Sequence, residues 1–296
     1  MYKSVLFATS THYSLPVLTQ LKSEGILKKV VLPDTFEEIK NILAPAVGED
    51  ICKLIGEKDP LPDHQDYDLV ILFAYPHKVP TVEGLKMVNI HFGPLPENRG
   101  PEPLFWTLKQ EKNLAYIAMH EVSAQYDAGD VLLEKGIDIL PGENYGMLWA
   151  RLAQQLPSYV TELVAGRYEP KPQDPSKAVY YPLPQPKDYT IDWNSMNVNQ
   201  IQRLVQASNP KYGGALTSLQ QSPLRLLDVN PAQVQMEGGQ TATPGQIVHA
   251  SSENGIYVAC INDQFLRLNI LSLIEGIFTD NRLASMGVPV GAILGS

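Results

Sequence analysis

The sequence lacks long hydrophobic runs, and this absence excludes an integral membrane protein built from helices. The longest nearly apolar run lies at 69–75, far short of the roughly 20 residues that a helix needs to cross a bilayer. The apolar segment that follows the first residues is also too short for the hydrophobic region of a signal peptide. We therefore expect a cytoplasmic protein.

Cysteine and clustered basic residues are also scarce. Cys52 and Cys260 are the only cysteines, and neither has the neighbours that a metal site requires, so we expect two reduced core residues and no metal. The chain has 23 Lys and Arg against 32 Asp and Glu, a net charge of −9. Proteins that bind nucleic acids gain affinity from clusters of Lys and Arg that neutralise phosphates. The absence of such a cluster disfavours a nucleic-acid partner.

The length and one proline-rich stretch predict two domains. A chain of 296 residues is typical of one larger and one smaller core. Six of the 17 residues at 170–186 are proline, a density that favours a stiff extended connection. We expect a domain at 1–169, a Pro-rich linker at 170–187 and a C-terminal domain at 188–296.

Apolar runs alternate with helical patterns in the first domain. Strands are predicted at 4–8, 30–32, 68–75, 88–91, 116–122 and 131–139, and helices at 14–22, from Thr35 and at 144–164. Thr35 and Glu38 have the spacing of a capping box. The alternation indicates an α/β fold, an open and mainly parallel Rossmann-like sheet with helices on both faces. After a helix at 198–207, short apolar segments at 224–229, 246–249, 255–261 and 265–273 predict a small C-terminal β-barrel.

Two polar side chains stand at the end of the strand predicted at 88–91. Asn89 and His91 are two residues apart, so they project from the same face of the strand, and Ile90 projects from the other. A loop rich in Gly and Pro follows. Ligands of open α/β sheets bind outside the carboxyl ends of the strands, so this position suits an active site.

A second polar segment follows the strand predicted at 116–122. His120 lies on that strand, and Asp127 and Asp130 flank Gly129 in the next loop. An aspartate beside His91 would orient the imidazole and raise its pKa from a reference near 6.5. Each segment alone is also compatible with a structural histidine or an ordinary turn.

In this order and spacing, the residues resemble the folate-dependent formyltransferase family. The similarity rests on Asn89, His91, Leu95, Pro96, Arg99, Gly100, His120, Asp127, Gly129 and Asp130. Beyond the linker, Asp192-Trp193, Asn209-Pro210, the segment 244–247 and the glycine-spaced ending at 287–295 resemble the C-terminal domain of methionyl-tRNA formyltransferases.

The resemblance implies an enzyme that uses 10-formyltetrahydrofolate as formyl donor and no metal. It implies that Asn89 and His91 stabilise the oxyanion and that Asp127 holds His91 and relays a proton. His120 is expected to support the structure rather than react. The residues implied to bind folate are Phe73, Ala74, Tyr75, Val79, Gly129 and Asp130, and those implied to bind the acceptor are Ser10, Tyr13 and Arg99.

The acceptor is where the sequence departs from the family pattern. Gly93-Pro94 replaces the usual Ser-Leu, and the segment 32–40, basic in the tRNA enzymes, is short and acidic here. Gln206 stands where those enzymes have arginine. We therefore expect a small amine acceptor, such as an amino sugar nucleotide or an amino acid derivative. Methionyl-tRNA is the first alternative, and water, which would make the chain a 10-formyltetrahydrofolate hydrolase, is the second. A non-catalytic ligand-binding module is disfavoured because Asn89, His91 and Asp127 are all intact.

Overall fold

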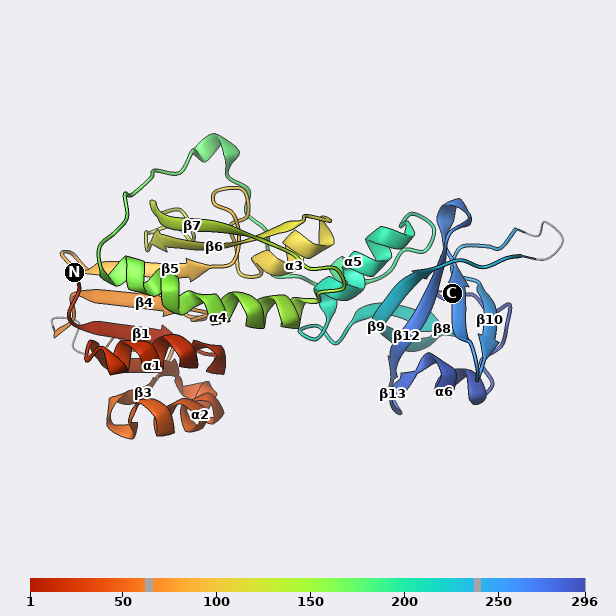
Figure 1. Ribbon diagram of the computed structural model, residues 1–296, viewed down its shortest axis with the longest axis horizontal. Coiled ribbons are helices and arrows are strands. Elements are labelled where there is room, and N and C mark those ends of the chain that lie inside the picture. The colour runs from red at the N-terminus through yellow and green to blue at the C-terminus, as the bar shows by residue number, and fades with distance from the viewer. Residues whose placement is uncertain (62–65, 237–240, 296) are drawn as a thin grey trace. The chain divides into compact units, whose positions relative to one another are not determined.

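The computed structural model describes residues 1–61, 66–236 and 241–295, and they form two compact units (Figure 1). Unit 1 comprises Met1–Pro103, Leu114–Asp138 and Trp149–Pro182, and unit 2 comprises Leu104–Asn113, Ile139–Leu148 and Leu183–Ser296. The chain thus leaves unit 1 twice before its final exit after Pro182. The predicted domains at 1–169 and 188–296, with a linker at 170–187, stay a prediction.

Unit 1 is built on a seven-stranded sheet with the order β3-β2-β1-β4-β5-β6-β7. The strands are β1 (Val5–Thr9), β2 (Leu27–Pro33), β3 (Cys52–Ile55), β4 (Leu69–Phe73), β5 (Lys86–His91), β6 (Leu114–Glu121) and β7 (Val131–Asp138). The first five are parallel, β6 is antiparallel to β5, and β7 is antiparallel to β6. Every residue of β1 and β4 is buried, as expected for central strands covered on both faces. The predicted α/β class with a mainly parallel sheet is confirmed.

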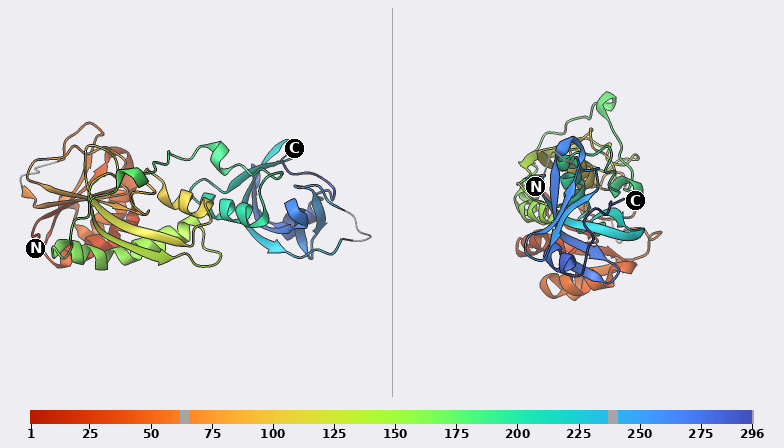
Figure 2. Two further views of the ribbon diagram at one scale, coloured as in Figure 1. Left: turned by 90° about the horizontal axis from the view of Figure 1, so that it is seen from above. Right: turned by 90° about the vertical axis from the view of Figure 1, so that its right-hand side faces the viewer.

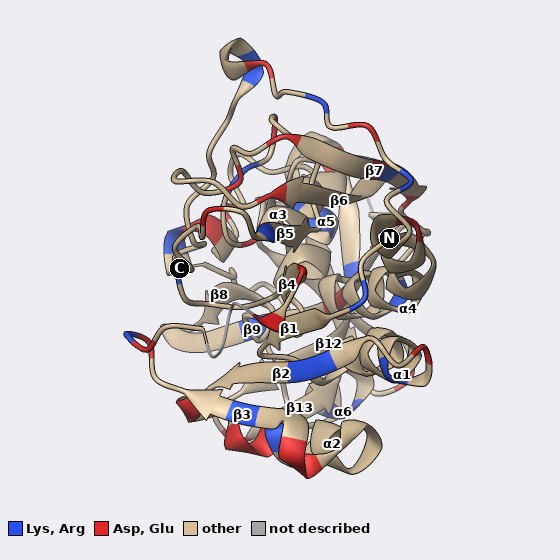
Figure 3. Cartoon of the chain, turned by 90° about the vertical axis from the view of Figure 1, so that its left-hand side faces the viewer, with Lys and Arg blue, Asp and Glu red and all other residues tan. Residues whose placement is uncertain are grey.

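Helices pack along one face of this sheet. They are α1 (Leu15–Ser23), α2 (Glu37–Val47) and the long α4 (Tyr145–Val164) (Figures 2 and 3). The opposite face carries a core cluster that includes Leu72 and Met87, against which Tyr75 and Leu85 pack. The described residues between β3 and β4, and between β4 and β5, contain no α-helix. Among the described residues, the second layer on that face is therefore formed by loops, whereas the sequence predicted helices on both faces.

The start of α2 also differs from the prediction. A short 3₁₀ helix, Asp34–Phe36, precedes α2, and the N-cap residue Phe36 makes no side-chain capping bond. The predicted capping box of Thr35 and Glu38 is therefore wrong. Acidic residues in the first turn, Glu37 and Glu38, still favour the helix because they face the positive end of its dipole.

Unit 2 contains a six-stranded antiparallel sheet with the order β10-β11-β12-β9-β8, and β13 pairs with β12. The elements are α5 (Val198–Ser208), β8 (Ala215–Leu219), β9 (Ser222–Ala232), β10 (Ile247–Ser251), β11 (Gly255–Ala259), β12 (Phe265–Leu273), β13 (Gly276–Thr279) and α6 (Asp280–Ser285). The final segment joins the two edge strands: the Gly291 N–H donates to the Ile247 carbonyl at 2.8 Å, and the Gly295 N–H donates to the Ser218 carbonyl at 2.9 Å. These bonds close the predicted barrel.

The short helix α3 (Pro103–Lys109) belongs to unit 2 except for its first residue, Pro103, which ends the first segment of unit 1. Across the described ranges, no helix is both long enough and apolar enough to span a membrane.

Candidate active site

The candidate site lies at the carboxyl ends of the central parallel strands of unit 1. Thr9 at the end of β1 pairs with Phe73 at the end of β4, which pairs with Ile90 near the end of β5. The strand order reverses between β1 and β4, the point at which open α/β sheets bind ligands. Ser10 and Ala74, both predicted to bind ligands, meet here because the Ser10 hydroxyl donates to the Ala74 carbonyl.

Antiparallel pairing brings His120 beside Asn89. The two residues are partners in the register of β5 and β6, and the Asn89 Nδ2 atom lies 3.1 Å from the His120 Nε2 atom. The His120 Nδ1 atom lies 2.9 Å from the Glu121 carbonyl oxygen, which can only accept a hydrogen bond. Nδ1 therefore carries a hydrogen, and Nε2 is the ring nitrogen that faces the Asn89 amide.

Asp127 completes the cluster from the loop after β6. Its Oδ1 atom lies 3.3 Å from the His120 Nε2 atom, 3.5 Å from the Asn89 Nδ2 atom and 3.9 Å from the His91 Nδ1 atom. Its Oδ2 atom accepts a hydrogen bond from the Gly100 N–H at 2.9 Å. The structure thus brings together the three residues predicted to react, and it adds His120 to them.

Charge and hydrogen bonding keep Asp127 ionised. Burial alone would raise the pKa of this carboxyl, but its neighbours His120 and His91 and the hydrogen bond from the Gly100 N–H lower it to about 2. The backbone of Asp127 is left-handed, with φ of 54°, which is uncommon for a residue other than glycine. The carboxylate is therefore held in place by a loop conformation that needs support from its surroundings.

His91 is buried and differs from the prediction in its protonation. The side chain is 5% exposed, and the Nε2 atom lies 2.7 Å from the Asn98 carbonyl oxygen. Burial lowers the pKa of His91 more than the nearby charge of Asp127 raises it. The predicted increase in pKa is therefore wrong, because removing the imidazolium from water costs more than one carboxylate 3.9 Å away returns. His91 is neutral, with its hydrogen on Nε2 and the lone pair of Nδ1 facing Asp127.

The segment predicted as a linker also reaches this site, through Gln173. The Gln173 Nε2 atom donates to the carbonyl oxygens of Asp127 at 2.8 Å and Gly129 at 2.7 Å. Its Oε1 atom accepts from the Nε atom of Arg99 at 3.0 Å and from the Nη2 atom at 2.6 Å. Sequence reasoning missed Gln173, because a glutamine in a proline-rich stretch carries no local signal for a role in a site.

Two of the predicted folate residues are buried by packing. The Phe73 side chain is 1% exposed, and its ring contacts those of Phe92 and Trp149. Val79 belongs to the core cluster on the other face of the sheet, against which Tyr75 packs. Only the backbones of Phe73 and Val79 are left for a ligand, since their side chains serve the core.

The remaining predicted residues are more accessible. Ala74 is exposed and has a left-handed backbone, with φ of 49°, and Gly129 and Asp130 are half-buried. Tyr13 is also half-buried, and its ring lies 4.9 Å from that of Trp149. A side chain at Gly129 would lie 2.0 Å from the Glu121 carbonyl oxygen. Glycine is therefore required for the loop to approach β6 this closely.

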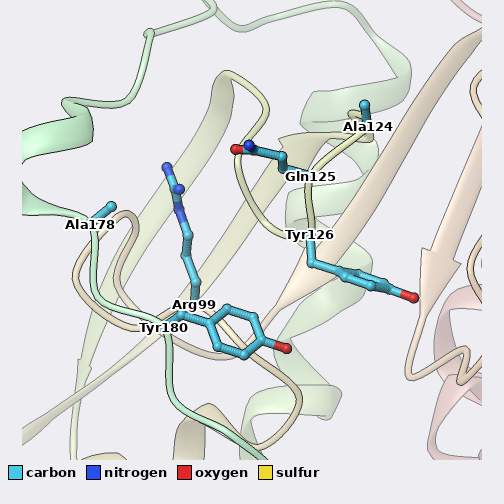
Figure 4. Close-up of a pocket in the computed structure, with 6 residues that line it drawn as sticks. All are labelled: Arg99, Ala124, Gln125, Tyr126, Ala178 and Tyr180. Carbon is cyan, nitrogen blue, oxygen red and sulfur yellow. The ribbon is translucent and has the colours of Figure 1, made fainter.

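A pocket opens beside Asp127. It is lined by Arg99, Ala124, Gln125, Tyr126, Ala178 and Tyr180 (Figure 4). Tyr126 and Tyr180 are each 56% exposed. Arg99 bonds the neutral Gln173, and among the described residues it has no carboxylate partner. The pocket therefore offers a cation and two aromatic rings one residue away from Gly100 and Asp127.

Within the described parts of the chain, no three His, Cys, Asp or Glu side chains are grouped to hold a metal ion.

Comparisons with known proteins extend over both units. The family described as "Formyl transferase, C-terminal domain" matches residues 184–277. The methionyl-tRNA formyltransferase of Geobacter sulfurreducens is 29% identical over 278 residues, which cover 86% of this chain and 85% of that protein.

Two solved structures share the fold. The structure of HypX from Aquifex aeolicus in complex with tetrahydrofolic acid aligns with a TM-score of 0.66 and 18% identity over 96% of this chain and 48% of that chain. This chain thus spans about half the length of HypX. A 4-N formyltransferase from Francisella tularensis aligns with a TM-score of 0.57 and 16% identity over 72% of this chain and 91% of that chain. The chain is thus similar to formyltransferases in sequence over both units, and it shares the fold of solved formyltransferase structures.

Proposed function

We propose that this chain transfers the formyl group of 10-formyltetrahydrofolate to a primary amine, with Asn89, His91 and Asp127 as the reacting groups. One observation carries the proposal: an amide and a neutral imidazole converge on an ionised carboxylate. The Asn89 Nδ2 atom lies 3.5 Å and the His91 Nδ1 atom 3.9 Å from the Asp127 Oδ1 atom. Formyl transfer to an amine requires hydrogen-bond donors for the oxygen that becomes negative and an acceptor for the proton of the amine.

Asn89 supplies the donor. One hydrogen of its Nδ2 atom is directed to His120 at 3.1 Å, and the other faces Asp127 at 3.5 Å, the limit of a hydrogen bond. The second hydrogen is therefore easily redirected to a substrate oxygen. Removing one donor of an oxyanion hole typically lowers kcat by about 100- to 1000-fold.

His91 and Asp127 handle the proton. As the nitrogen of the acceptor bonds to the formyl carbon, the carbonyl oxygen gains the negative charge and the amine loses a proton to the Nδ1 atom of His91. Asp127, whose Oδ1 atom lies 3.9 Å from Nδ1, stabilises the resulting imidazolium. The imidazolium then returns the proton to the N10 atom of the folate as the bond between N10 and the formyl carbon breaks.

The donor is proposed to lie along the end of β4 and the loop after β6. Because the side chains of Phe73 and Val79 are buried, contacts in this region would come from the backbone, from the exposed Ala74 and from Gly129 and Asp130. Because Gly129 has no side chain, the backbone of the loop lies close to β6. The outer edge of the loop is then free to contact the pteridine ring of the folate.

For the acceptor, we propose the amino group of methionyl-tRNA as the first candidate. Relatives named methionyl-tRNA formyltransferase align over about nine tenths of the chain, including both units: the protein of Bacillus subtilis covers 90% of it at 28% identity. The small amine predicted from the sequence is less well supported by these similarities. The pocket of Arg99, Tyr126 and Tyr180 has the chemistry to receive an acceptor that carries a phosphate and an aromatic base.

A small amine remains the second candidate because of one observation, the charge. The chain carries −9, the segment after β2 exposes Asp34, Glu37 and Glu38, and Lys and Arg are interspersed with Asp and Glu in Figure 3. A tRNA partner gains much of its affinity from clustered Lys and Arg. A small acceptor with one or two phosphates would need only Arg99 and one neighbouring polar group to bind those phosphates.

One assay separates the candidates. The protein is incubated with 10-formyltetrahydrofolate, and release of tetrahydrofolate is followed with methionyl-tRNA, with an amino sugar nucleotide, with free methionine and without acceptor. Turnover with methionyl-tRNA supports the first candidate, and turnover only with the nucleotide or the amino acid supports the second. Equal rates with and without any acceptor identify a hydrolase and contradict the proposed transfer.

A further inference from the structure

Gln173 uses both ends of its side-chain amide to join two segments of the site. Its NH₂ group donates to the carbonyl oxygens of Asp127 and Gly129, and its carbonyl oxygen accepts two hydrogens of Arg99. One side chain thus contacts the loop of the reacting carboxylate and the arginine of the pocket. Both segments belong to unit 1.

The Asp127 loop has a backbone conformation that needs support. Asp127 has φ of 54°, and such backbone strain persists only where the surroundings enforce it. Tyr126, the residue before it, is more than half exposed. The two bonds from Gln173 hold the carbonyl groups at Asp127 and Gly129, so they fix the orientation from which the carboxylate projects.

The backbone around Gln173 is held on both sides. Lys171 exchanges two backbone hydrogen bonds with Val131 at the start of β7, at 2.8 and 2.9 Å. Further along, the Arg99 N–H donates to the Val179 carbonyl at 2.9 Å, and the Tyr181 N–H donates to the Arg99 carbonyl at 2.8 Å. The segment 171–181 is therefore clipped to the sheet and to the Arg99 loop, and Gln173 lies between the two attachments.

We propose that Gln173 is a positioning residue that sets the Asp127 carboxylate for proton transfer and couples it to occupation of the Arg99 pocket. The proposal rests on the proposed function for its effect on turnover, but its structural part concerns the free protein. An acceptor that binds Arg99 would shift the guanidinium group. Because Gln173 bonds both Arg99 and the Asp127 carbonyl, this shift would move Gln173 and the backbone of Asp127. The reacting group would then be aligned when the acceptor is in place.

Two substitutions separate the two contacts. Gln173→Glu keeps an oxygen for Arg99 but removes both donors to the Asp127 loop, and Gln173→Met removes both contacts at similar length. Lys177→Gln is the matched control, because Lys177 lies in the same segment, its side chain is 65% exposed, and it forms an ion pair with Asp174 at 4.0 Å.

The first readout is hydrogen–deuterium exchange of the free protein. Both Gln173 variants are expected to exchange faster than wild type at 126–130, and only Gln173→Met also at 99–100, while Lys177→Gln matches wild type. This readout needs no acceptor, so it tests the positioning even if every acceptor fails and the proposed function is wrong. Unchanged exchange at 126–130 in both Gln173 variants overturns the proposal.

The second readout is turnover with the acceptor that the wild type uses. Because a displacement of about 1 Å can cost about 100-fold in rate, kcat per active site should fall by about 10- to 100-fold in both Gln173 variants. KM for the acceptor should rise in Gln173→Met but little in Gln173→Glu. A role confined to stability would lower the melting temperature and leave kcat per folded molecule at the wild-type value, and that result also overturns the proposal.

Discussion

Replacing Gly100 by alanine tests how tightly the loop before α3 is built around the reacting carboxylate. A Cβ atom at Gly100 would lie 2.0 Å from the Tyr181 carbonyl oxygen, whereas real Cβ contacts are essentially never below 3.0 Å. The backbone of one of the two segments must therefore move by about 1 Å to reach an allowed van der Waals contact. Gly100 also has φ of 119°, a region that favours glycine.

These distances give the expected loss of stability. The strain of the left-handed backbone costs about 1–3 kcal/mol. A shift of about 1 Å also breaks the 2.9 Å hydrogen bond from the Gly100 N–H to Asp127, and a bond to a charged group contributes about 1.5–3 kcal/mol. We expect Gly100→Ala to lower the free energy of unfolding by about 2.5–6 kcal/mol in total, and to raise the pKa of Asp127 because a donor to its carboxylate is lost.

Gly84→Ala is the matched control. Gly84 has φ of 78° and no atom within 4 Å of the Cβ position, so this variant adds backbone strain without crowding. The free energies of unfolding are measured by urea denaturation, and turnover is measured with 10-formyltetrahydrofolate. If Gly100→Ala is no less stable than Gly84→Ala and equally active, the close approach at Tyr181 and its role in holding Asp127 are refuted.

Three further predictions concern pH, the acceptor pocket and the barrel. Because burial lowers the pKa of His91, the unfolded chain binds more protons than the folded chain just below the reference pKa of about 6.5, so the free energy of unfolding should fall as pH falls through that value. The His91→Asn variant should lose less stability over the same pH interval, as measured by pH-dependent melting curves. An identical loss would contradict the assignment. Arg99→Gln should raise KM for the acceptor by about 10-fold or more, as expected for a charged contact of about 1.5–3 kcal/mol, while titration with a folate shows unchanged affinity; weaker folate binding instead would move Arg99 to the donor site. Trp193→Phe should destabilise unit 2 by about 1–3 kcal/mol, because it removes the buried hydrogen bond from the indole Nε1 atom to the Thr217 hydroxyl at 2.9 Å; calorimetry would contradict this if the melting temperature were unchanged.

The sequence predicted best the elements whose composition is compatible with only one kind of secondary structure. The central strand β4 is an unbroken apolar run, β1 is apolar up to Thr9, and the structure buries every residue of both. The short elements β3, α3, β13 and α6 have 4 to 7 residues each, too few to show a period of hydrophobic residues. Their structure depends on partners that are distant in sequence, such as β2 for β3.

The site was predictable in its reacting residues but not in its surroundings. Asn89 and His91 lie two residues apart on one strand, so their common face follows from the geometry of a strand. The contact of Asp127 with His120, and the bonds from Gln173, join segments that are up to 46 residues apart. The protonation of His91 depends on burial by the whole unit, which the local pattern of residues does not contain.

The measurement that tests the central claim most directly is single-turnover release of tetrahydrofolate by Asn89→Ala and His91→Ala, with folate binding measured on the same preparations. If these residues stabilise the transition state, each rate should fall by about 100-fold or more while the affinity for folate stays close to that of the wild type. Wild-type rates in both variants would contradict the assignment of this cluster as the reacting site.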